Sequence, residues 1–441
     1  MTTIFAPITG ALNSGVSVIR ISGVQTISAL KALGFLKNPE HQKIYFHKII
    51  DQNNELIDEA LISFFKAPNS LTGEDVAEIG IHSSPFILKK IFNILSAQKN
   101  VRFAEAGEFL KTAFLNGKID LVQAEAVPDL IACETEMQHK QAIRQLQGEL
   151  GKIYDDWRQR LIEILAQIEA FIDFPEDDLP QNLIDKIDFE VKNLSNEIKN
   201  HLNDNNLGQK IKNGLSLAIL GLPNVGKSSL INFLAQSEVA IVSDIAGTTR
   251  DVLEIHLSIA GIPVKIADTA GLRKSDDKIE QEGVRRAIKK AEEVDIKILI
   301  LDAINPIIPD QIDFSDAIVL ANKIDLEDKK FIKNQDFLKN FKEIIPISIN
   351  KRINLDIFIK KLEEKVLQIA PQSHCALITQ ERYRIALKDC LKHLSSFSLN
   401  NNIEIAAEDL RLAAFEIGKI TGKIDIENIL DVIFSRFCIG K

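Results

Sequence analysis

The sequence predicts a multidomain protein of the α+β and α/β classes: an N-terminal α+β domain, an all-α helical domain in two chain segments, and a doubly wound α/β domain inserted between those segments. At 441 residues the chain is too long for one hydrophobic core. Apolar runs that alternate with helical stretches indicate a parallel sheet covered on both faces, and helical periodicity flanks them. The predicted domain segments are 1–118, 119–212, 213–371 and 372–441.

The composition is that of an ordinary globular protein, with 45% hydrophobic and 26% charged residues. The net charge of −9 is unlike that of a dedicated nucleic-acid-binding protein. The four cysteines show no metal-ligand spacing, which indicates reduced thiols. The first residues, "MTTIFAPITG", show no basic n-region or long apolar h-region, and no run approaches the roughly 18 apolar residues of a membrane span. We therefore expect a cytoplasmic protein with no membrane attachment.

Apolar runs bounded by turn residues predict the strands of the N-terminal domain. They are "SVIRISG", "KIYFHKII", "LIDEALISFFKAPNS" and "DVAEIGIH", and the helix-like "SPFILKKIFNILSAQ" follows them. From Leu121 the pattern is helical, until Pro175 and Pro180 interrupt it, and it becomes helical again after "APQSH". We expect the two helical segments to pack together, since a domain is readily inserted where its ends lie close.

A phosphate-binding loop opens the α/β domain. The stretch "LSLAILGLPNVGKSSLINFL" places Gly221-x-x-x-x-Gly226-Lys227-Ser228 between a predicted strand and a predicted helix, the context that a P-loop requires. Backbone N–H groups and the helix N-terminus attract phosphate. Lys227 neutralises terminal phosphate oxygens, and the Ser228 hydroxyl is a ligand for Mg²⁺.

Two further motifs indicate a guanine nucleotide. "DTAG", at 268–271, closes one apolar run and suits contacts to the Mg²⁺ shell and the γ-phosphate. "NKID", at 322–325, closes a later run, and the Asp325 carboxylate can accept from N1–H and the exocyclic amine of guanine, donors that adenine lacks. Between the P-loop and "DTAG", "VSDIAGTTRD" is the expected switch segment, in which Thr249 reaches Mg²⁺.

GTP is therefore the predicted ligand. The predicted GTP-binding residues are Asn224, Val225, Gly226, Lys227, Ser228, Ser229, Ser243, Asp244, Ile245, Ala246, Gly247, Thr248, Thr249, Asp268, Thr269, Ala270, Gly271, Asn322, Lys323, Ile324 and Asp325.

The residue after "DTAG" is Leu272, where many GTPases carry the Gln that orients the attacking water. Either the protein is a slow switch or its catalysis is arranged differently. Glu280, in "RKSDDKIEQEG", is the main candidate for binding that water, against the alternative of a solvated surface carboxylate. Asn224 offers an oxygen to a monovalent cation that spreads charge in the transition state. The predicted catalytic residues are Glu280, Lys227 and Asn224.

Six stretches together form a specific combination: "LTGEDVAEIGIH", "GEFLKTAFLNGKIDLVQAEAVPDLI", "GLPNVGKSSLIN", "VSDIAGTTRDVLE", "DTAGLR" followed by Glu280, and the terminal "FCIGK". Through them the chain resembles, over essentially its whole length, the MnmE (TrmE) family of bacterial and organellar tRNA modification GTPases.

The resemblance implies a homodimer formed through the N-terminal domain, whose fold is similar to the folate-binding domains of glycine-cleavage T-proteins. It implies that 5-formyl-tetrahydrofolate, or a related one-carbon folate, contacts Arg20, Glu78, Lys118 and Lys441. It also implies an FAD-dependent partner of the MnmG type in a heterotetramer. Together the two subunits add an aminomethyl or carboxymethylaminomethyl group to the wobble uridine of certain tRNAs.

The resemblance also assigns the cations. Mg²⁺ falls at Ser228 and Thr249, and K⁺ at Asn224, Ser243, Ile245 and Thr248. In the family K⁺ stimulates hydrolysis by promoting dimerisation of G domains. By the resemblance, Glu280 corresponds to the family's catalytic carboxylate.

Four departures limit the resemblance. "TGALNSG" replaces a glycine-rich turn, Ser83 and Ser84 replace glycines, Ala106 replaces a proline, and Ile349 replaces a small residue after Ser348. The first two lie in the folate-binding domain, where they are expected to alter the loops, since glycine permits backbone conformations that serine resists. The catalytic parts of the G domain are intact.

The chain ends in "SRFCIGK", which resembles the family's C-terminal signature, brought back by the last helices toward the folate pocket. A prenylation box needs two aliphatic residues after its Cys, and only Ile439 fits, so we expect no lipid anchor. Cys438 is either a reactive thiol or a packed side chain.

Two other functions stay open at this point, a ribosome-assembly GTPase and a non-catalytic GTP-dependent scaffold. Ribosome-assembly GTPases usually carry basic appendages, whereas these flanking helices are acidic or neutral. A scaffold is favoured if Leu272 means that catalysis is lost.

Overall fold

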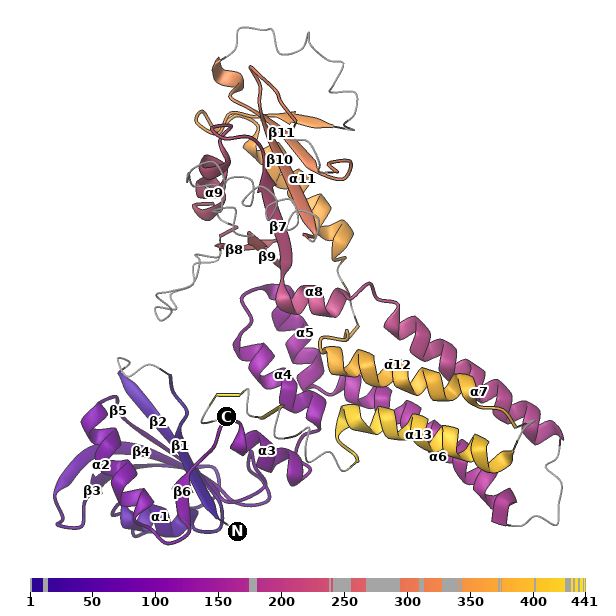
Figure 1. Cartoon of the computed structure of the whole chain (residues 1–441). Coiled ribbons are helices and arrows are strands. Elements are labelled where there is room, and N and C mark those ends of the chain that lie inside the picture. The colour runs from indigo at the N-terminus through magenta and orange to yellow at the C-terminus, as the bar shows by residue number, and fades with distance from the viewer. Residues whose placement is uncertain are drawn as a thin grey trace, which may run out of the picture. The chain divides into compact units, whose positions relative to one another are not determined.

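The computed structural model divides into two compact units (Figure 1). One unit comprises Met1–Pro128, Gln145–Asp178 and Ser396–Lys441, and the other comprises Asp129–Arg144 and Leu179–Ser395. The structure describes residues 2–10, 15–173, 181–237, 239–240, 255–266, 294–308, 313–326, 341, 343–371, 373, 375–399, 402–424, 430, 433–434, 437–438 and 440.

The N-terminal domain is built on a six-stranded sheet of order β3-β4-β5-β2-β1-β6. Its elements are β1 (Thr3–Pro7), β2 (Val16–Ser22), α1 (Thr26–Ala32), β3 (Lys43–Ile50), β4 (Leu56–Phe65), β5 (Val76–His82), α2 (Pro85–Ser96), β6 (Val101–Phe103) and α3 (Glu108–Leu115). Alternate residues of the strands, such as Ile19 and Ile21 of β2, are buried with Leu30 of α1 and Ile91 of α2. Because side chains alternate along a strand, α1 and α2 cover one face of this sheet.

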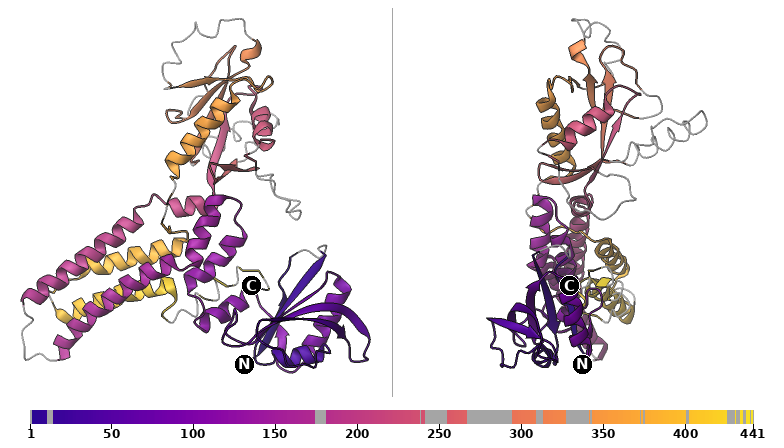
Figure 2. Two further views of the ribbon diagram at one scale, coloured as in Figure 1. Left: turned by 180° about the vertical axis from the view of Figure 1, so that it is seen from behind. Right: turned by 90° about the vertical axis from the view of Figure 1, so that its left-hand side faces the viewer.

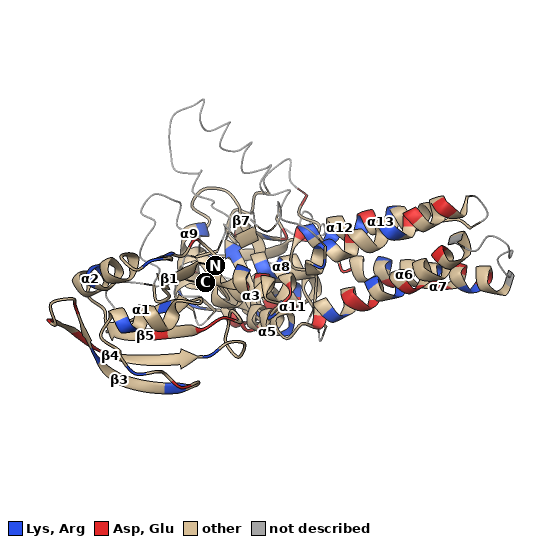
Figure 3. Ribbon diagram, turned by 90° about the horizontal axis from the view of Figure 1, so that it is seen from below, with Lys and Arg blue, Asp and Glu red and all other residues tan. Residues whose placement is uncertain are grey.

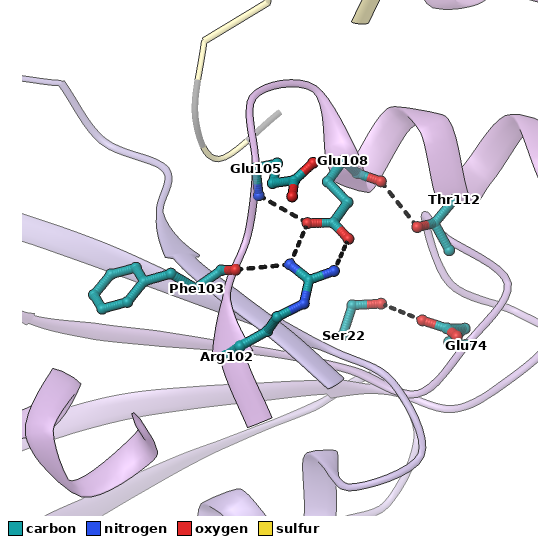
Figure 4. A network of polar contacts seen from close by, with 7 residues as sticks. All are labelled: Ser22, Glu74, Arg102, Phe103, Glu105, Glu108 and Thr112. Carbon is teal, nitrogen blue, oxygen red and sulfur yellow. Dashed lines mark hydrogen bonds and ion pairs between the residues drawn. The ribbon is translucent and has the colours of Figure 1, made fainter. Parts of the chain in front are cut away.

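An ion pair joins β6 to α3 (Figure 4). The guanidinium of Arg102 donates to the Glu108 carboxylate at 2.9 and 2.5 Å, and the N–H of Glu105 donates to it at 2.7 Å. Burial raises the pKa of Glu108, but these hydrogen bonds and the positive charge outweigh burial and hold the pKa below its ordinary value. The pair fixes the first turn of α3, where a carboxylate also interacts favourably with the helix dipole.

Two groups of helices precede and follow, in the sequence, the strands of a second sheet. They are α4 (Leu121–Ile131), α5 (Glu136–Leu146), α6 (Glu149–Asp173), α7 (Gln181–Leu202) and α8 (Leu207–Asn213) before it, and α12 (Glu381–Ser396) and α13 (Ile403–Thr421) after it. In the first unit α6 packs against α13 (Figure 2). The two helices are antiparallel, because Arg411 pairs with Glu169 at 2.5 Å and Lys423 pairs with Asp155 at 2.9 Å. Helices from the two predicted segments therefore do pack together.

The second sheet is doubly wound, as the sequence predicts, with the order β12-β11-β10-β7-β9-β8. Its elements are β7 (Leu215–Leu220), α9 (Lys227–Ala235), β8 (Ile255–Ile259), β9 (Ile262–Ile266), β10 (Ile296–Asp302), β11 (Ile318–Asn322), the 3-10 helix η2 (Ile324–Leu326), β12 (Ile344–Pro346) and α11 (Leu355–Ile369). All neighbouring strands are parallel except β8 and β9. Leu217 of β7 packs in one core with Leu230 of α9 and Phe358 of α11. From β7 the chain first builds β8 and β9 on one side and then β10, β11 and β12 on the other.

No helix in the described part of the chain is long and apolar enough to span a bilayer.

Candidate nucleotide-binding site

The P-loop follows β7 and leads directly into α9. Lys227, the first residue of α9, donates from Nζ to the carbonyl oxygens of Gly221 at 2.8 Å and Leu222 at 2.7 Å. Its ammonium group thus lies against the loop backbone, and burial lowers the pKa of Lys227. The N–H groups in the first turn of a helix have no acceptor within the helix. This loop therefore combines backbone donors with a lysine ammonium, the combination that binds phosphate.

Two glycines of the loop stand where a side chain would not fit. Gly221 has φ of +148°, and a Cβ there would lie 2.3 Å from the carbonyl oxygen of Ile300 on β10. Gly226 has φ of +111°, and a Cβ there would lie 2.3 Å from Nδ2 of Asn322. Both the backbone conformation and the close approach to neighbouring strands require glycine.

Asn322 connects the P-loop to the predicted guanine motif. It ends β11, is 5% exposed, and donates from Nδ2 to the carbonyl oxygen of Val225 at 2.9 Å. Its Oδ1 accepts from the N–H of Ile349 at 3.2 Å. The Ser348 hydroxyl in turn donates to Oδ1 of Asp325 at 2.5 Å. These bonds hold the P-loop, residues 322–325 and the loop after β12 together.

The three loops lie at the carboxyl edge of the sheet. Register pairs Asp302, the last residue of β10, with Asn322, and pairs Leu299 of β10 with Leu220 at the end of β7. In open parallel sheets ligands bind at this edge, at the strand where the connections change direction. β7 is that strand here, so the fold places the P-loop at the expected position of a ligand.

The predicted site residues divide into described and undescribed groups. Those of the P-loop, 224–229, and of "NKID", 322–325, surround the edge just described, with Asn224 and Ser228 exposed. The predicted residues that lie outside the described part of the chain are Ser243, Asp244, Ile245, Ala246, Gly247, Thr248, Thr249, Asp268, Thr269, Ala270, Gly271, Glu280 and Lys441.

Two of the predicted folate contacts meet in the N-terminal domain. Arg20 of β2 donates from Nε and Nη2 to Oε1 of Glu78 on β5, at 3.0 and 2.8 Å. Its guanidinium lies 5.5 Å from the ring centroid of Phe109 on α3. Lys118 donates from Nζ to the carbonyl oxygen of Pro68 at 2.8 Å. An arginine beside a carboxylate and an aromatic ring offers both charges and a flat apolar surface.

The C-terminal tail returns to this domain. The N–H of Gly107 donates to the carbonyl oxygen of Cys438 at 3.4 Å. A Cβ on Gly440 would lie 2.3 Å from the carbonyl oxygen of Pro7, at the end of β1. Since β1 pairs with β2 and Ala6 faces Arg20 in that register, Gly440 lies against the strand next to the one that carries Arg20. The tail therefore reaches the N-terminal domain, and Cys438 is exposed. Its approach to a folate pocket stays a prediction.

Comparison with known proteins decides the family. Residues 121–438 match the family model described as "MnmE helical domain", and residues 3–118 match the model described as "GTP-binding protein TrmE N-terminus". Curated relatives from Rickettsia typhi and Rickettsia akari, each named "tRNA modification GTPase MnmE", are 46% identical over 100% of both chains. The chain belongs to the MnmE family.

The resemblance seen in the sequence is thereby confirmed. As a member of the MnmE family the chain binds GTP and is a GTP hydrolase with a role in tRNA modification. Among solved structures, a variant of Era from Aquifex aeolicus bound to GDP.AlF4- is 27% identical, over 41% of this chain and 66% of that chain, with a TM-score of 0.27. That score is too low for the likeness to bear on the arrangement of this MnmE-family chain.

Sequence reasoning missed one charged residue at the edge of this MnmE-family site. Asp302 pairs with Lys323 of "NKID", Nζ to Oδ2 at 2.6 Å. Its signal in the sequence is that "IKILILD" is an apolar run closed by a carboxylate, as the run before "DTAG" is. A carboxylate that directly follows a buried parallel strand lies at the ligand-binding edge.

Proposed function

We propose that this chain is a K⁺-stimulated, Mg²⁺-dependent GTPase of the cytoplasm that works with an FAD-dependent subunit of the MnmG type. In this proposal the heterotetramer adds an aminomethyl or carboxymethylaminomethyl group to C5 of the wobble uridine of certain tRNAs. Family membership over the full length of both chains supports it. The observation that carries the GTPase part is the 2.9 Å bond from Asn322 to the P-loop, since it brings "NKID" against the phosphate-binding loop.

The described residues fit the cations that this proposal requires. Ser228 and Asn224 are exposed in the P-loop and present hydroxyl and amide oxygens, the ligand type that hard cations prefer. We assign Mg²⁺ to Ser228 with Thr249, and K⁺ to Asn224 with the oxygens of Ser243, Ile245 and Thr248. When bound, the cations neutralise charge that develops on the phosphates.

In the proposed mechanism the protein orients its substrate from both ends. Lys227 binds the terminal phosphate oxygens, and Asp325, held by Ser348, accepts from the guanine ring. Glu280 binds the attacking water, directly or through a second water.

Contacts within the second unit support the idea that hydrolysis drives movement of the helices. His256 follows the switch segment by a few residues and bonds to Glu134, just before α5, at 2.9 Å. The N–H of Met137 in α5 donates to the carbonyl oxygen of Gly261, between β8 and β9, at 3.1 Å. Lys210 of α8 pairs with Asp295 at 3.5 Å. The hairpin of β8 and β9, which follows the switch segment in the chain, is thus joined to α5, and the residue before β10 is joined to α8.

The folate part of the proposal rests on the N-terminal domain, 1–118, and on the tail. The Arg20–Glu78 pair offers a donor for a carboxylate and an acceptor for the N–H groups of a pterin, and we place Lys118 and Lys441 at the same ligand. Neither Ser83 nor Ser84 has a positive φ, and Ser84 is extended at −119°. The two serines therefore sit in this fold without the backbone strain that replacing a glycine can bring.

A sheet face with exposed apolar side chains, in the described part of this domain, supports a homodimer. On the side of the sheet away from α1 and α2, Phe46 of β3 is 67% exposed, and its cross-strand neighbour Leu61 of β4 is 56% exposed. Ile44 and Val16 on the same side are 70% and 56% exposed. The ribbon of β3 and β4 is uncharged over most of its length in Figure 3. Such a patch on one sheet usually marks a protein interface.

We therefore expect Leu61→Glu to convert the protein from a dimer to a monomer, because the dimer would bury the new carboxylate in an apolar contact. Light scattering on the purified protein would then give the mass of a single chain, 49.3 kDa. Leu36→Glu is the matched control: Leu36 is 78% exposed and lies outside the strands of this face, so this variant should stay dimeric. A dimeric Leu61→Glu would rule this face out.

The tRNA reaction is tested in cells. Mass analysis of wobble nucleosides from a strain that lacks this protein should show loss of the C5-aminomethyl and carboxymethylaminomethyl groups, and expression of the chain should restore them. Unchanged wobble nucleosides would refute the tRNA assignment. If rRNA precursors accumulated instead, the ribosome-assembly alternative would gain support.

A further inference from the structure

The side chain of Asp302 lies at the edge of the nucleotide site and is held by two hydrogen bonds. Its carboxylate accepts from Nζ of Lys323 at 2.6 Å through Oδ2 and from the N–H of Ile304 at 2.9 Å through Oδ1. The exposed fraction of the side chain is 29% for Lys323 and 20% for Asp302, so both side chains are partly buried. Burial raises the pKa of Asp302, but the bonds from Lys323 and the loop outweigh it and lower the pKa. The carboxylate is therefore charged and held from two sides.

Lys323 needs such an anchor more than most lysines do. Its backbone has φ of +74°, a conformation that residues with a Cβ rarely adopt and that tends to be kept at functional sites. A lysine side chain has four rotatable bonds and little intrinsic order. Without a partner for its ammonium group, the stem of Lys323 would sample many positions over the loop.

The neighbours of Lys323 in the motif are anchored in the same way. Asn322 is tied to Val225 of the P-loop at 2.9 Å, and Asp325 is tied to Ser348 at 2.5 Å. Asp302 completes the set from a third direction, on β10, where register places it opposite Asn322. Each polar side chain of "NKID" is thus held by a different loop or strand of the protein itself.

We propose that Asp302 is a positioning residue for guanine-nucleotide binding, which acts by fixing the side chain of Lys323 beside the base-binding loop. This inference rests on the proposed nucleotide site and deepens it. Asp302 acts through Lys323 and needs no contact of its own with the nucleotide. Pre-ordering a binding side chain improves affinity because less freedom is lost on binding. The effect therefore falls on nucleotide affinity and leaves the chemical step unchanged.

The test uses the full-length protein with Asp302→Asn, which keeps the size of the side chain and removes its charge. We expect the Kd for GDP, measured by calorimetry, to rise about tenfold, as loss of one charge-assisted contact near the surface would cause. The kcat at saturating GTP should stay within about twofold of the original. Asp302→Glu, which keeps the charge, should recover most of the affinity.

Two further variants separate positioning from general stability. Asp316→Asn breaks another lysine–carboxylate pair of the same sheet domain, with Lys365, and should bind GDP normally. In a Lys323→Met background, Asp302→Asn should add no further loss, since the residue it positions is gone. Melting without nucleotide reports the folding of each variant. If Asp302→Asn proves unstable, Lys323→Met decides the question, because normal GDP affinity in that variant would leave Asp302 no binding side chain to position.

Unchanged GDP affinity in Asp302→Asn overturns the inference, and so does an equal loss in the Lys323→Met background. Failure of the unaltered protein to bind GDP would instead refute the nucleotide site itself.

Discussion

Lys227→Ala should abolish nucleotide binding through the phosphates, with affinity for GDP and for a non-hydrolysable GTP analogue falling about 100-fold or more, as expected for loss of a partly buried charge contact. In the structure Nζ of Lys227 is held only by carbonyl oxygens of the loop, at 2.7 and 2.8 Å among the bonds described. Phosphate oxygens carry full negative charge and bind an ammonium group more strongly than carbonyl oxygens do. The substitution therefore removes the side chain that compensates the charge of the ligand.

Calorimetry with each nucleotide measures this effect. Lys297→Ala is the control, because Lys297 lies on β10 and its Nζ bonds to the carbonyl oxygen of Asp313 at 3.2 Å, away from the P-loop residues. That variant should bind like the unaltered protein. Near-normal affinity in Lys227→Ala would show that the loop does not grip phosphate as proposed. Absence of any heat from GDP with the unaltered protein would remove the GTPase interpretation altogether.

The sequence predicts the second sheet better than the first, for a physical reason. Buried parallel strands such as β10 and β11 read as continuous apolar runs, and β7 and β11 also lead into recognisable motifs, the P-loop and "NKID". β8 was missed because "EIHLSI" lies at the sheet edge, where polar residues interrupt the apolar pattern. In the N-terminal domain β1, β6, α1 and α3 were missed, and all are short. Short elements depend on their neighbours more than on their own residues.

At the site, residue types were predictable and their partners were not. The P-loop and "NKID" follow from local sequence, but the bond from Asn322 to Val225 spans 97 positions. The Asp302–Lys323 pair likewise depends on the register of β10 with β11. Register is decided by which faces of the strands are buried across the whole sheet. Such contacts therefore appear only once the chain is folded.

Glu280→Ala should leave GTP affinity within about twofold of normal and lower kcat about 100-fold or more, the range expected when a group that activates water is lost. The chemical reason lies next to "DTAG", where Leu272 stands in place of the Gln that orients water in many GTPases. Leucine has no group that can hold a water molecule. Another group has to hold the attacking water when GTP is hydrolysed. A carboxylate can both orient that water and accept its proton.

The control for this prediction is Glu282→Ala, which removes a carboxylate two residues away in the same charged stretch. Turnover of GTP should be measured for all three proteins with Mg²⁺, in K⁺ and then in Na⁺. The proposal requires a rate in K⁺ that exceeds the rate in Na⁺, because K⁺ is assigned to stabilise transition-state charge, and it requires that Glu280→Ala loses this rate while Glu282→Ala keeps it. An equal loss of turnover rate in both variants would show that Glu280 has no specific catalytic role. Equal and negligible rates of the unaltered protein in both salts would favour a scaffold that binds GTP without using it.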